Sequence, residues 1–279
     1  MNAIRIEDPA DERIADYRNI PDADLMARRG LFVAEGRLVV QRLLASGRWT
    51  PRSLLVTDPA LAALGPVLDA HSTVPTFIAD QRVMNAITGF NIHRGCLALG
   101  ERNPAAEWRP LVEPAAMVVA IERLGNADNV GAIFRNAAAF GVDVVLLGPA
   151  CADPLYRKSI RTSMGAALSV PFATVRPWPR ALESLGAEGW AVVALAPAAA
   201  TLVRNTAVQI AGRRVVIVVG HEGEGLTPDT LRVCTHHAAI PMARGVDSLN
   251  AATAAAIAMY EFAARDHRSD RSDRSRSDG

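Results

Sequence analysis

The sequence contains little lysine, little aromatic surface and almost no excess of either charge. Lys158 is the only lysine among 30 Lys and Arg side chains, and 29 Asp and Glu side chains balance them to a formal net charge of +1. Phe, Trp and Tyr together make up 5% of the chain. A protein that binds nucleic acid by charge alone carries a marked basic excess, so this balance argues against that class.

Cysteine is also scarce, and long apolar runs are missing. The three cysteines, at 96, 151 and 234, are odd in number, lie far apart and form no C-x-x-C pair. This pattern argues against a disulfide framework and against a zinc site, so we expect a reducing compartment and no metal. No run reaches the ~18 apolar residues of a membrane span, and the acidic N-terminus is unlike a signal peptide. The sequence therefore predicts a soluble cytoplasmic protein.

The chain does contain enough apolar residues to form the cores of two domains. Half of its 279 residues are hydrophobic, and this length supports a substantial core. We expect five segments: a loose lead-in over 1–20, a small domain over 21–100, a proline-rich linker over 101–114, an α/β domain over 115–265, and a disordered Arg/Ser/Asp tail over 266–279. Alternating short helices and strands in the small domain predict an α/β or α+β sandwich.

The larger domain has the pattern of a parallel sheet covered by helices. Near-continuous apolar runs predict strands at 117–121, 142–147, 190–195 and 215–219, because strands buried on both faces lack polar alternation. Helices are expected between them, at 130–140, 179–188 and 228–233. An alanine-rich helix over 251–265 follows. The domain is predicted to be doubly wound.

A first candidate functional stretch covers 126–141, directly after the predicted strand 117–121. Asn129 lies where an N-cap is expected, and Arg135 follows about two turns into the helix. Helical side chains lean toward the N-terminus, so Arg135 could reach back toward the loop. Its apolar neighbours make burial costly unless it meets an anion. A phosphate or a carboxylate of the protein itself could be that anion.

A second stretch, 220–226, follows the predicted strand 215–219. Gly220, Gly223 and Gly225 allow a sharp turn and a close approach to a ligand. The order G-x-x-G-x-G is not a dinucleotide fingerprint, and Gly225 stands where a zinc-protease helix needs its second histidine. Glu222 follows a parallel strand, where α/β ligand sites lie. A plain tight turn is the alternative.

A third stretch runs from Ile240 through Pro241 and Met242 to Ser248, Leu249 and Asn250, before the helix 251–265. Ser or Asp at its start is a good N-cap, because a side-chain oxygen can accept a hydrogen bond from a free amide of the first turn. The alternative is that this stretch has only a structural role, as the start of a capped core helix.

A fourth stretch is locally basic. Residues 155–176 contain four basic side chains and no acid. Arg157, Lys158, Arg161 and Ser163 fall on one short segment of it, which makes this segment a candidate phosphate-contacting face. An ordinary solvated helix surface is the alternative.

Taken in order, the first three stretches resemble the SpoU (TrmH-type) family of RNA ribose 2′-O-methyltransferases. The matching residues are Asn129-x-Gly131-x-Ile133-x-Arg135 with Phe140-Gly141, then Gly220-x-Glu222-x-x-Gly225-Leu226, and then Ile240-Pro241-Met242 with Ser248-Leu249-Asn250. The resemblance covers roughly 115–265. More weakly, Phe32 to Arg37 and Arg94-Gly95 resemble the substrate-binding domain that often precedes it.

The resemblance implies a deep trefoil knot in the C-terminal domain, a ribosomal-protein-like RNA-binding fold before it, and a homodimer. It implies S-adenosylmethionine as cofactor, and rRNA or tRNA as substrate. The implied cofactor contacts are Leu195, Ala196, Pro197, Gly220, Glu222, Gly225, Ile240, Met242, Ser248 and Leu249. Position 221 departs from the family, which often has Asn there, where this chain has His221. That histidine either changes a loop hydrogen bond or adds a titrating group.

For catalysis the resemblance implies Arg135, Asn129, Glu222, Ser248 and Asn250. In the family the arginine orients a phosphate and lowers the pKa of the ribose hydroxyl. We favour electrostatic action over proton abstraction, because a guanidinium rarely releases its proton. Two competing hypotheses are a non-catalytic RNA-binding or ribosome-assembly protein with this fold, and a dinucleotide-dependent enzyme, which the missing fingerprint disfavours.

Overall fold

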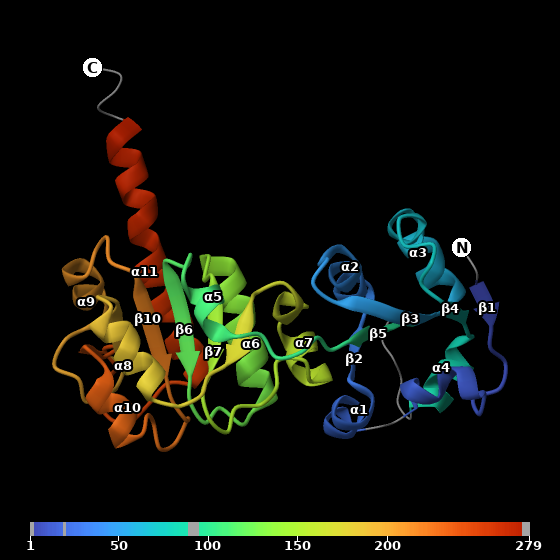
Figure 1. Ribbon diagram of the computed structural model, residues 1–279, viewed down its shortest axis with the longest axis horizontal. Helices are drawn as coiled ribbons and strands as arrows, with labels where there is room; N and C mark the ends of the chain where they lie inside the picture. Colours follow the sequence, from blue (N-terminus) through green and yellow to red (C-terminus); the bar gives the residue numbers. More distant parts are fainter. Residues whose placement is uncertain (1–2, 19–20, 89–94, 275–279) are drawn as a thin grey trace. The chain divides into compact units, whose positions relative to one another are not determined.

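The computed structural model describes residues 3–18, 21–88 and 95–274, with side chains up to residue 263 except at residue 88. Its contacts divide the chain into two compact units (Figure 1). Unit 1 combines Met1–Pro104 with Asp153–Ser169, and unit 2 combines Ala105–Ala152 with Val170–Gly279. Within the described ranges, no helix is long and apolar enough to cross a bilayer.

Unit 1 is built on a five-stranded mixed sheet. Its strands are β1 (Ala3–Arg5), β2 (Leu31–Glu35), β3 (Thr50–Val56), β4 (Thr76–Ile78) and β5 (Cys96–Glu101), in the order β1-β4-β3-β5-β2. The β1–β4 and β4–β3 pairs are parallel, and β5 is antiparallel to both β3 and β2. Its helices are η1 (Glu12–Tyr17), α1 (Asp22–Arg29), α2 (Arg37–Ala45), α3 (Asp58–Asp69) and α4 (Gln81–Thr88), together with α7 (Arg157–Thr162) and η2 (Ala166–Leu168) from the later segment.

The lead-in prediction for 1–20 is wrong over most of its described part. β1 is an edge strand of the sheet, and Ile14 and Tyr17 are buried in the core of unit 1. The Tyr17 hydroxyl lies 2.8 Å from the Ser53 hydroxyl in a buried hydrogen bond. Acidic side chains around these positions concealed three apolar anchors, Ile6 included, which bury almost all of their surface.

Unit 2 contains a six-stranded sheet in which every pair is parallel. Its strands are β6 (Met117–Ile121), β7 (Val144–Leu147), β8 (Phe172–Thr174), β9 (Ala191–Leu195), β10 (Val215–Val219) and β11 (His236–Ala238), in the order β11-β9-β10-β6-β7-β8. β6 and β10 are buried at every residue, as continuous apolar runs require. The doubly wound interpretation is confirmed in its central feature, an α/β parallel sheet.

Helices cover the sheet of unit 2 in two groups. They are α5 (Trp108–Val112), α6 (Ala127–Phe140), α8 (Arg180–Ala187), α9 (Val203–Gln209), α10 (Pro228–Val233) and α11 (Ala251–Arg274). α11 packs against α6, α9 and β10, while α8 packs against α10 and β9. The core between them includes Trp190 and the apolar faces of β6, β7, β9 and β10.

Two predicted boundaries also change. The linker shortens to about 102–107, because Glu101 ends β5 and Val112 of α5 is buried. The disordered tail is wrong for 266–274, where α11 continues to Arg274. That stretch contains neither Pro nor Gly, so a helix started by the alanine-rich run can propagate through it. Residues 275–279 of the predicted tail, and Arg94 of the substrate-domain motif, lie outside the described residues.

Candidate active site

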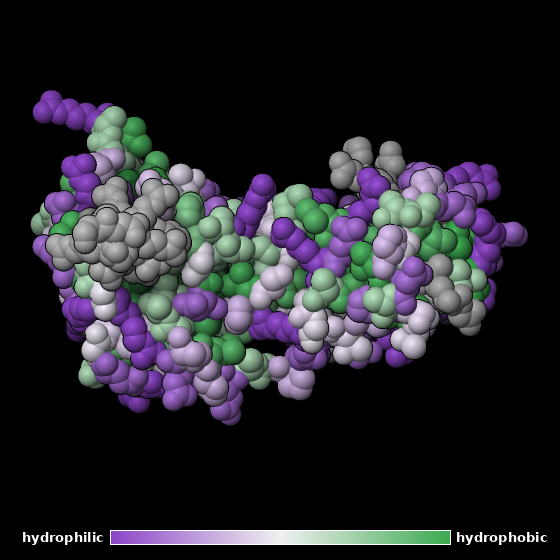
Figure 2. Space-filling model, turned by 90° about the horizontal axis from the view of Figure 1, so that it is seen from above, coloured by the Kyte–Doolittle hydropathy of each residue, from purple (hydrophilic) through white to green (hydrophobic). Residues whose placement is uncertain are grey.

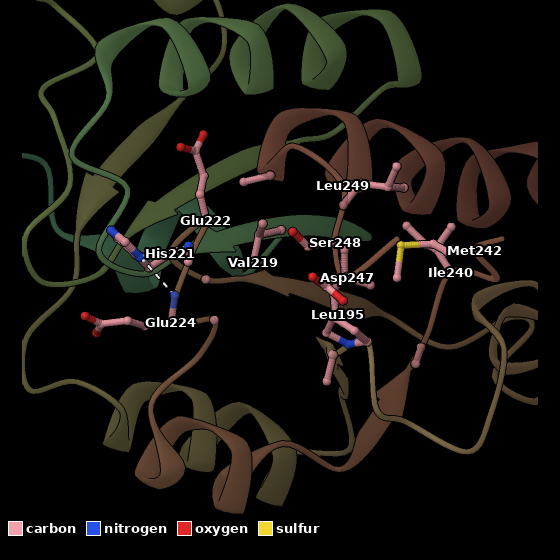
Figure 3. Close-up of a pocket in the computed structure, with 18 residues that line it drawn as sticks. Leu195, Val219, His221, Glu222, Glu224, Ile240, Met242, Asp247, Ser248 and Leu249 are labelled. Atoms are coloured by element: carbon pink, nitrogen blue, oxygen red, sulfur yellow. Dashed lines mark hydrogen bonds between the residues drawn. The ribbon is translucent and has the colours of Figure 1, made fainter. Parts of the chain in front are cut away.

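A cavity of about 310 Å³ opens at the carboxyl ends of three parallel strands, β9, β10 and β11 (Figure 3). Ligands of α/β sheets bind at such ends. Every predicted cofactor contact lines this cavity: Leu195, Ala196, Pro197, Gly220, Glu222, Gly225, Ile240, Met242, Ser248 and Leu249. His221, which the sequence singled out as a departure from the family, also lines it. Val219, Glu224, Ala238, Asp247 and Ala254 are among the further lining residues that the sequence did not single out.

The lining combines apolar walls with carboxylates. Leu195, Ile240 and Leu249 provide aliphatic surface, and Glu222, Glu224 and Asp247 are the acidic residues in the lining, which contains no Lys or Arg. Such a surface favours a ligand with cationic and apolar parts. It disfavours the pyrophosphate of a dinucleotide, which binds where backbone amides and positive charge meet it.

The Gly220–Leu226 loop is shaped by two close backbone approaches. A Cβ on Gly220 would lie 2.4 Å from the carbonyl carbon of Gly225, so only glycine fits there. His221 and Gly225 exchange backbone hydrogen bonds, of 3.1 Å from the His221 amide and 2.9 Å from the Gly225 amide. Gly225 itself has a φ of +69°, which favours glycine. The loop is therefore a narrow turn, fixed by its own backbone contacts, and it lines the cavity.

His221 stabilises this loop from inside. Its Nδ1 accepts hydrogen bonds from the amides of Gly223 and Glu224, each at 3.1 Å. An asparagine side chain accepts from following amides in the same way in an Asx turn. At position 221, histidine therefore accepts the loop hydrogen bonds that an asparagine side chain could also accept.

A buried carboxylate that the sequence did not single out holds the far end of the loop. Glu122 is 1% exposed. Its Oε1 accepts from Trp178 Nε1 at 2.9 Å and from the hydroxyls of Thr227 and Thr230 at 2.9 and 2.8 Å, and its Oε2 accepts from the Thr227 amide at 3.0 Å. Thr227 follows directly after the loop. In the sequence, the one sign of this role is that a charged residue follows the apolar strand 117–121 directly.

Three of the predicted catalytic residues come together beside the cavity. Asn250 Nδ2 donates to Asn129 Oδ1 at 2.9 Å and to Glu222 Oε1 at 3.3 Å. In Figure 3 the Glu222 side chain is directed toward the helices, away from Leu195. Asn129 is 6% exposed, and its Nδ2 has no hydrogen-bond partner in the described part of the chain. The cluster thus contains a buried N–H donor, Asn129 Nδ2, whose hydrogen bond an oxygen atom of a bound ligand could accept.

Both predicted helix caps are wrong. Asn126 caps α6, accepting from the Asp128 amide, so Asn129 lies within the first turn and points into the unit. Asn250 caps α11, because its Oδ1 accepts from the amides of Ala252 and Thr253 at 3.0 and 3.2 Å. Ser248 is consequently free of the capping role and is an exposed residue that lines the cavity.

Arg135 does not join the cluster in the single chain. It is an exposed residue of α6 with no hydrogen bond or ion pair to any residue that the structure describes. Six positions separate it from Asn129, a rotation of roughly 240° around the helix, so the two side chains leave different faces. A structural pair with a carboxylate of the described chain is therefore not formed.

The predicted RNA contacts lie in unit 1, on α7 and the turn after it. Lys158 and Arg161 are exposed, whereas Arg157 pairs with Asp22, whose carboxylate also accepts from the Arg157 amide at 2.8 Å. Ser163 is fully buried. Its hydroxyl donates to the Ile160 carbonyl and accepts from the Ala167 amide. The prediction that Ser163 contacts RNA is therefore wrong, because the turn uses this hydroxyl internally.

Comparisons with known proteins agree with this site. The family model described as "SpoU rRNA Methylase family" matches residues 116–260. A Mycobacterium bovis protein described as an uncharacterized tRNA/rRNA methyltransferase is 42% identical over 91% of this chain and 89% of its own. An AdoMet-bound rRNA methyltransferase from Sinorhizobium meliloti has a TM-score of 0.79 at 23% identity, over 93% of this chain and 97% of its own. An RNA 2′-O ribose methyltransferase has a TM-score of 0.77 at 24% identity, over 95% and 99%.

The two structural relatives are too distant in sequence to carry more than the fold. The family match spans the strand before Asn129, the glycine loop and the start of α11, which are the elements that form the cavity and the polar cluster. Together with the Mycobacterium relative, this match establishes that the chain belongs to the SpoU rRNA methylase family.

Proposed function

We propose that this protein transfers a methyl group from S-adenosylmethionine to a ribose 2′-hydroxyl in rRNA or tRNA. The observation that carries the proposal is the acidic and aliphatic cavity beside the Asn129–Asn250–Glu222 cluster. The cofactor carries a positive sulfonium and an ammonium group, which the lining carboxylates of Glu222 and Asp247 suit; the third, Glu224, pairs with Arg123. The two structural relatives, an AdoMet-bound rRNA methyltransferase and an RNA 2′-O ribose methyltransferase, agree with the proposal.

In this proposal the aliphatic side chains and the loop backbone bind the cofactor. Leu195, Ile240 and Leu249 would enclose its apolar parts, and the backbone around Gly220 would hydrogen-bond its polar edges. The cofactor supplies a methyl group that its sulfonium already activates. The protein therefore has to position the acceptor and stabilise charge, without a metal.

The polar residues would hold the ribose. Asn129 Nδ2 is a buried donor without a described partner, so it would donate to a ribose oxygen. Ser248 would contact the reacting hydroxyl, and Glu222 and Asn250 would fix the orientation of Asn129 through their existing hydrogen bonds. Arg135 would bind the adjacent phosphate and stabilise the developing alkoxide electrostatically.

The test is the Arg135→Ala variant. Because Arg135 is exposed and bonds no described residue, its removal should leave the fold and cofactor affinity unchanged, with methyl transfer to RNA lowered by at least ~100-fold. Calorimetry measures cofactor binding, and incorporation of labelled methyl into total rRNA and tRNA measures transfer. Transfer at the wild-type rate would remove the assigned role.

A non-catalytic RNA-binding or ribosome-assembly protein is the competing function. Failure of the wild-type chain to bind S-adenosylmethionine in calorimetry would favour it. Mapping 2′-O-methyl positions in total RNA from cells with and without this gene identifies the nucleotide. The cytoplasm, where these RNAs are found, is the predicted compartment.

Homodimerisation through unit 2 stays a prediction, as does the trefoil knot. The dimer is supported by an aromatic pair in which only one ring is exposed: the partly buried Phe140 of α6 and Tyr260 of α11 meet edge to face with ring centroids 6.1 Å apart. Tyr260 keeps 58% of its surface exposed. A second copy that covered these helices would bury that ring.

A further inference from the structure

Three acidic side chains line the cavity of unit 2, and two of them are engaged by other residues. Glu224 pairs with Arg123, which follows β6. Glu222 Oε1 accepts a hydrogen bond from Asn250 Nδ2 at 3.3 Å. In Figure 3 both glutamate side chains point away from Leu195. Neither carboxylate is therefore directed toward the aliphatic wall of the cavity.

The third acid, Asp247, differs from the other two. Its carboxylate has no hydrogen bond or ion pair with any residue in the described ranges. In Figure 3 it lies between the side chains of Ser248 and Leu195. The lining contains no Lys or Arg that could neutralise it. The Asp247 carboxylate is therefore available to a cation that enters the cavity.

The backbone on both sides of Asp247 is fixed. Before it, the Val246 amide donates to the Ala243 carbonyl at 3.3 Å in a turn. After it, Asn250 caps the first turn of α11. A side chain placed between a closed turn and a capped helix loses little conformational entropy when it binds a ligand.

An exposed acid by itself indicates no site. Over the face of the molecule in Figure 2, hydrophilic side chains lie scattered among hydrophobic ones, and the charged side chains of folded proteins are mostly exposed to water. Asp247 is set apart because Leu195 and Ile240 line the same cavity with aliphatic surface. Apolar walls lower the local dielectric constant, which strengthens a pair between a carboxylate and a bound cation.

S-adenosylmethionine has two positive groups, the sulfonium and the α-ammonium of its methionine part. Methyl transfer removes the sulfonium charge, so an acid beside the sulfonium would stabilise the bound cofactor more than the transition state and slow the reaction. The ammonium keeps its charge throughout the transfer. An acid that contacts the ammonium therefore strengthens cofactor binding without opposing the reaction.

We propose that Asp247 binds the α-ammonium group of S-adenosylmethionine and is the residue by which the cavity selects this cofactor over neutral adenosine thioethers. The inference rests on the proposed function, in that it takes the cavity to be the cofactor site. It separates the role of Asp247, which is cofactor selection, from that of the adjacent Ser248, which is contact with the ribose.

Calorimetry with the full chain and three ligands tests this assignment. S-adenosylmethionine carries both cations, S-adenosylhomocysteine keeps only the ammonium, and 5′-methylthioadenosine has neither. Asp247→Asn should weaken binding of the first two ligands by about tenfold, the effect of losing one charge-assisted hydrogen bond. Binding of 5′-methylthioadenosine should be unchanged, which also shows that the cavity of the variant is intact.

Asp229→Asn is the matched control. Asp229 makes an exposed ion pair with Arg232 and lies outside the lining, so the same charge is removed away from the cavity. All three affinities of this control should equal those of the wild-type chain. In methyl transfer, Asp247→Asn should leave the single-turnover rate at saturating cofactor unchanged, because an interaction felt equally before and during the reaction does not alter that rate.

The other outcomes overturn the assignment. A loss confined to S-adenosylmethionine places Asp247 at the sulfonium, and equal losses for all three ligands mean that Asp247 only shapes the cavity. No loss for any ligand removes Asp247 from the cofactor contacts. If the wild-type chain binds S-adenosylmethionine but does not methylate RNA, only the proposed function is wrong, and the three affinities still decide the role of Asp247. A wild-type chain that binds none of the ligands overturns both proposals.

Discussion

Asn250 uses both ends of its side-chain amide. The oxygen caps α11, and the nitrogen donates to Asn129 and Glu222. A residue that starts a helix is fixed in position by that helix, so the donor at the other end is held at a defined place in the cluster. Ser248, released from capping, keeps its hydroxyl for a ligand.

Glu122 works in a comparable way from beneath the loop. All four of its hydrogen-bond partners donate to it. Two of them, the Trp178 ring N–H and the Thr227 amide, cannot turn round to accept. Its two side-chain oxygens, which act only as acceptors here, are therefore matched to the donors of this pocket.

Glu122→Gln should disturb the loop without touching the cavity. The new NH2 group would face a donor, leaving a buried group unsatisfied at a cost of about 1–3 kcal/mol in the free energy of unfolding. We expect weaker S-adenosylmethionine binding, by roughly tenfold, and a smaller effect on the maximal rate, measured by calorimetry and methyl transfer. Glu188→Gln, at an exposed ion pair, is the control and should cost less than ~1 kcal/mol. Equal effects of the two variants would contradict a positioning role.

At the scale of elements, the glycine loop is the part of the cavity that tolerates least change. Gly220→Ala places a methyl group 2.4 Å from the Gly225 backbone, a contact that no side-chain motion relieves. We expect the loop to open and S-adenosylmethionine affinity to fall by at least tenfold. Gly65→Ala, within α3 and with no atom within 4 Å of the added Cβ, is the matched control. It lies in unit 1 and should leave cofactor binding unchanged, although a Cβ before Pro66 is disfavoured in a helix and stability should not rise. Wild-type cofactor binding by Gly220→Ala would refute the packing argument.

Elements with a long apolar run were predictable, and short ones were not. β6, β10 and α10 have the predicted bounds, because four or five consecutive β-branched and apolar residues, or a Pro at N1, define them locally. Three-residue strands such as β1, β8 and β11 depend on their neighbours in the sheet, so their own sequences carry little signal. The cofactor contacts could be listed from the family motifs, whereas Glu122 could be found only from its contacts.

At the scale of the whole molecule, residues 153–169 show what could not be predicted from the sequence. They lie between β7 and β8 of unit 2 in sequence, yet pack in unit 1 through Arg102, Arg42 and Trp49. Their amino-acid composition does not indicate whether they pack in the core of unit 1 or of unit 2. The basic segment was recognised from its charge, but the unit that it joins could be identified only from the fold.

The whole molecule should lose stability at alkaline pH. Burial raises the pKa of Cys96 to about 12, of Cys151 to about 11 and of Cys234 to about 12. The folded chain therefore keeps thiol protons that the unfolded chain releases near pH 9. This stabilisation is complete below the unfolded pKa and is lost as the pH rises toward the folded values, by up to about 1 kcal/mol per thiol for each pH unit.

Urea unfolding at pH 8 and at pH 10.5 measures this effect, with a lower midpoint expected at pH 10.5. Tyr17, whose pKa burial also raises, acts in the same direction at higher pH. Replacing Cys234 by Ala should reduce the difference between the two midpoints. A midpoint that rises with pH would contradict the assignment.

The return of residues 153–169 to unit 1 also sets the order in which the protein can be completed during synthesis. The first 104 residues leave the ribosome long before the segment that supplies α7 and η2 to their unit. Until residue 169 has emerged, Trp49 has no Leu168 carbonyl to bond and Arg42 no Met164 carbonyl. Unit 1 therefore closes only after more than half of the chain has been made, and an expression clone that stops at residue 104 would encode an unfinished module.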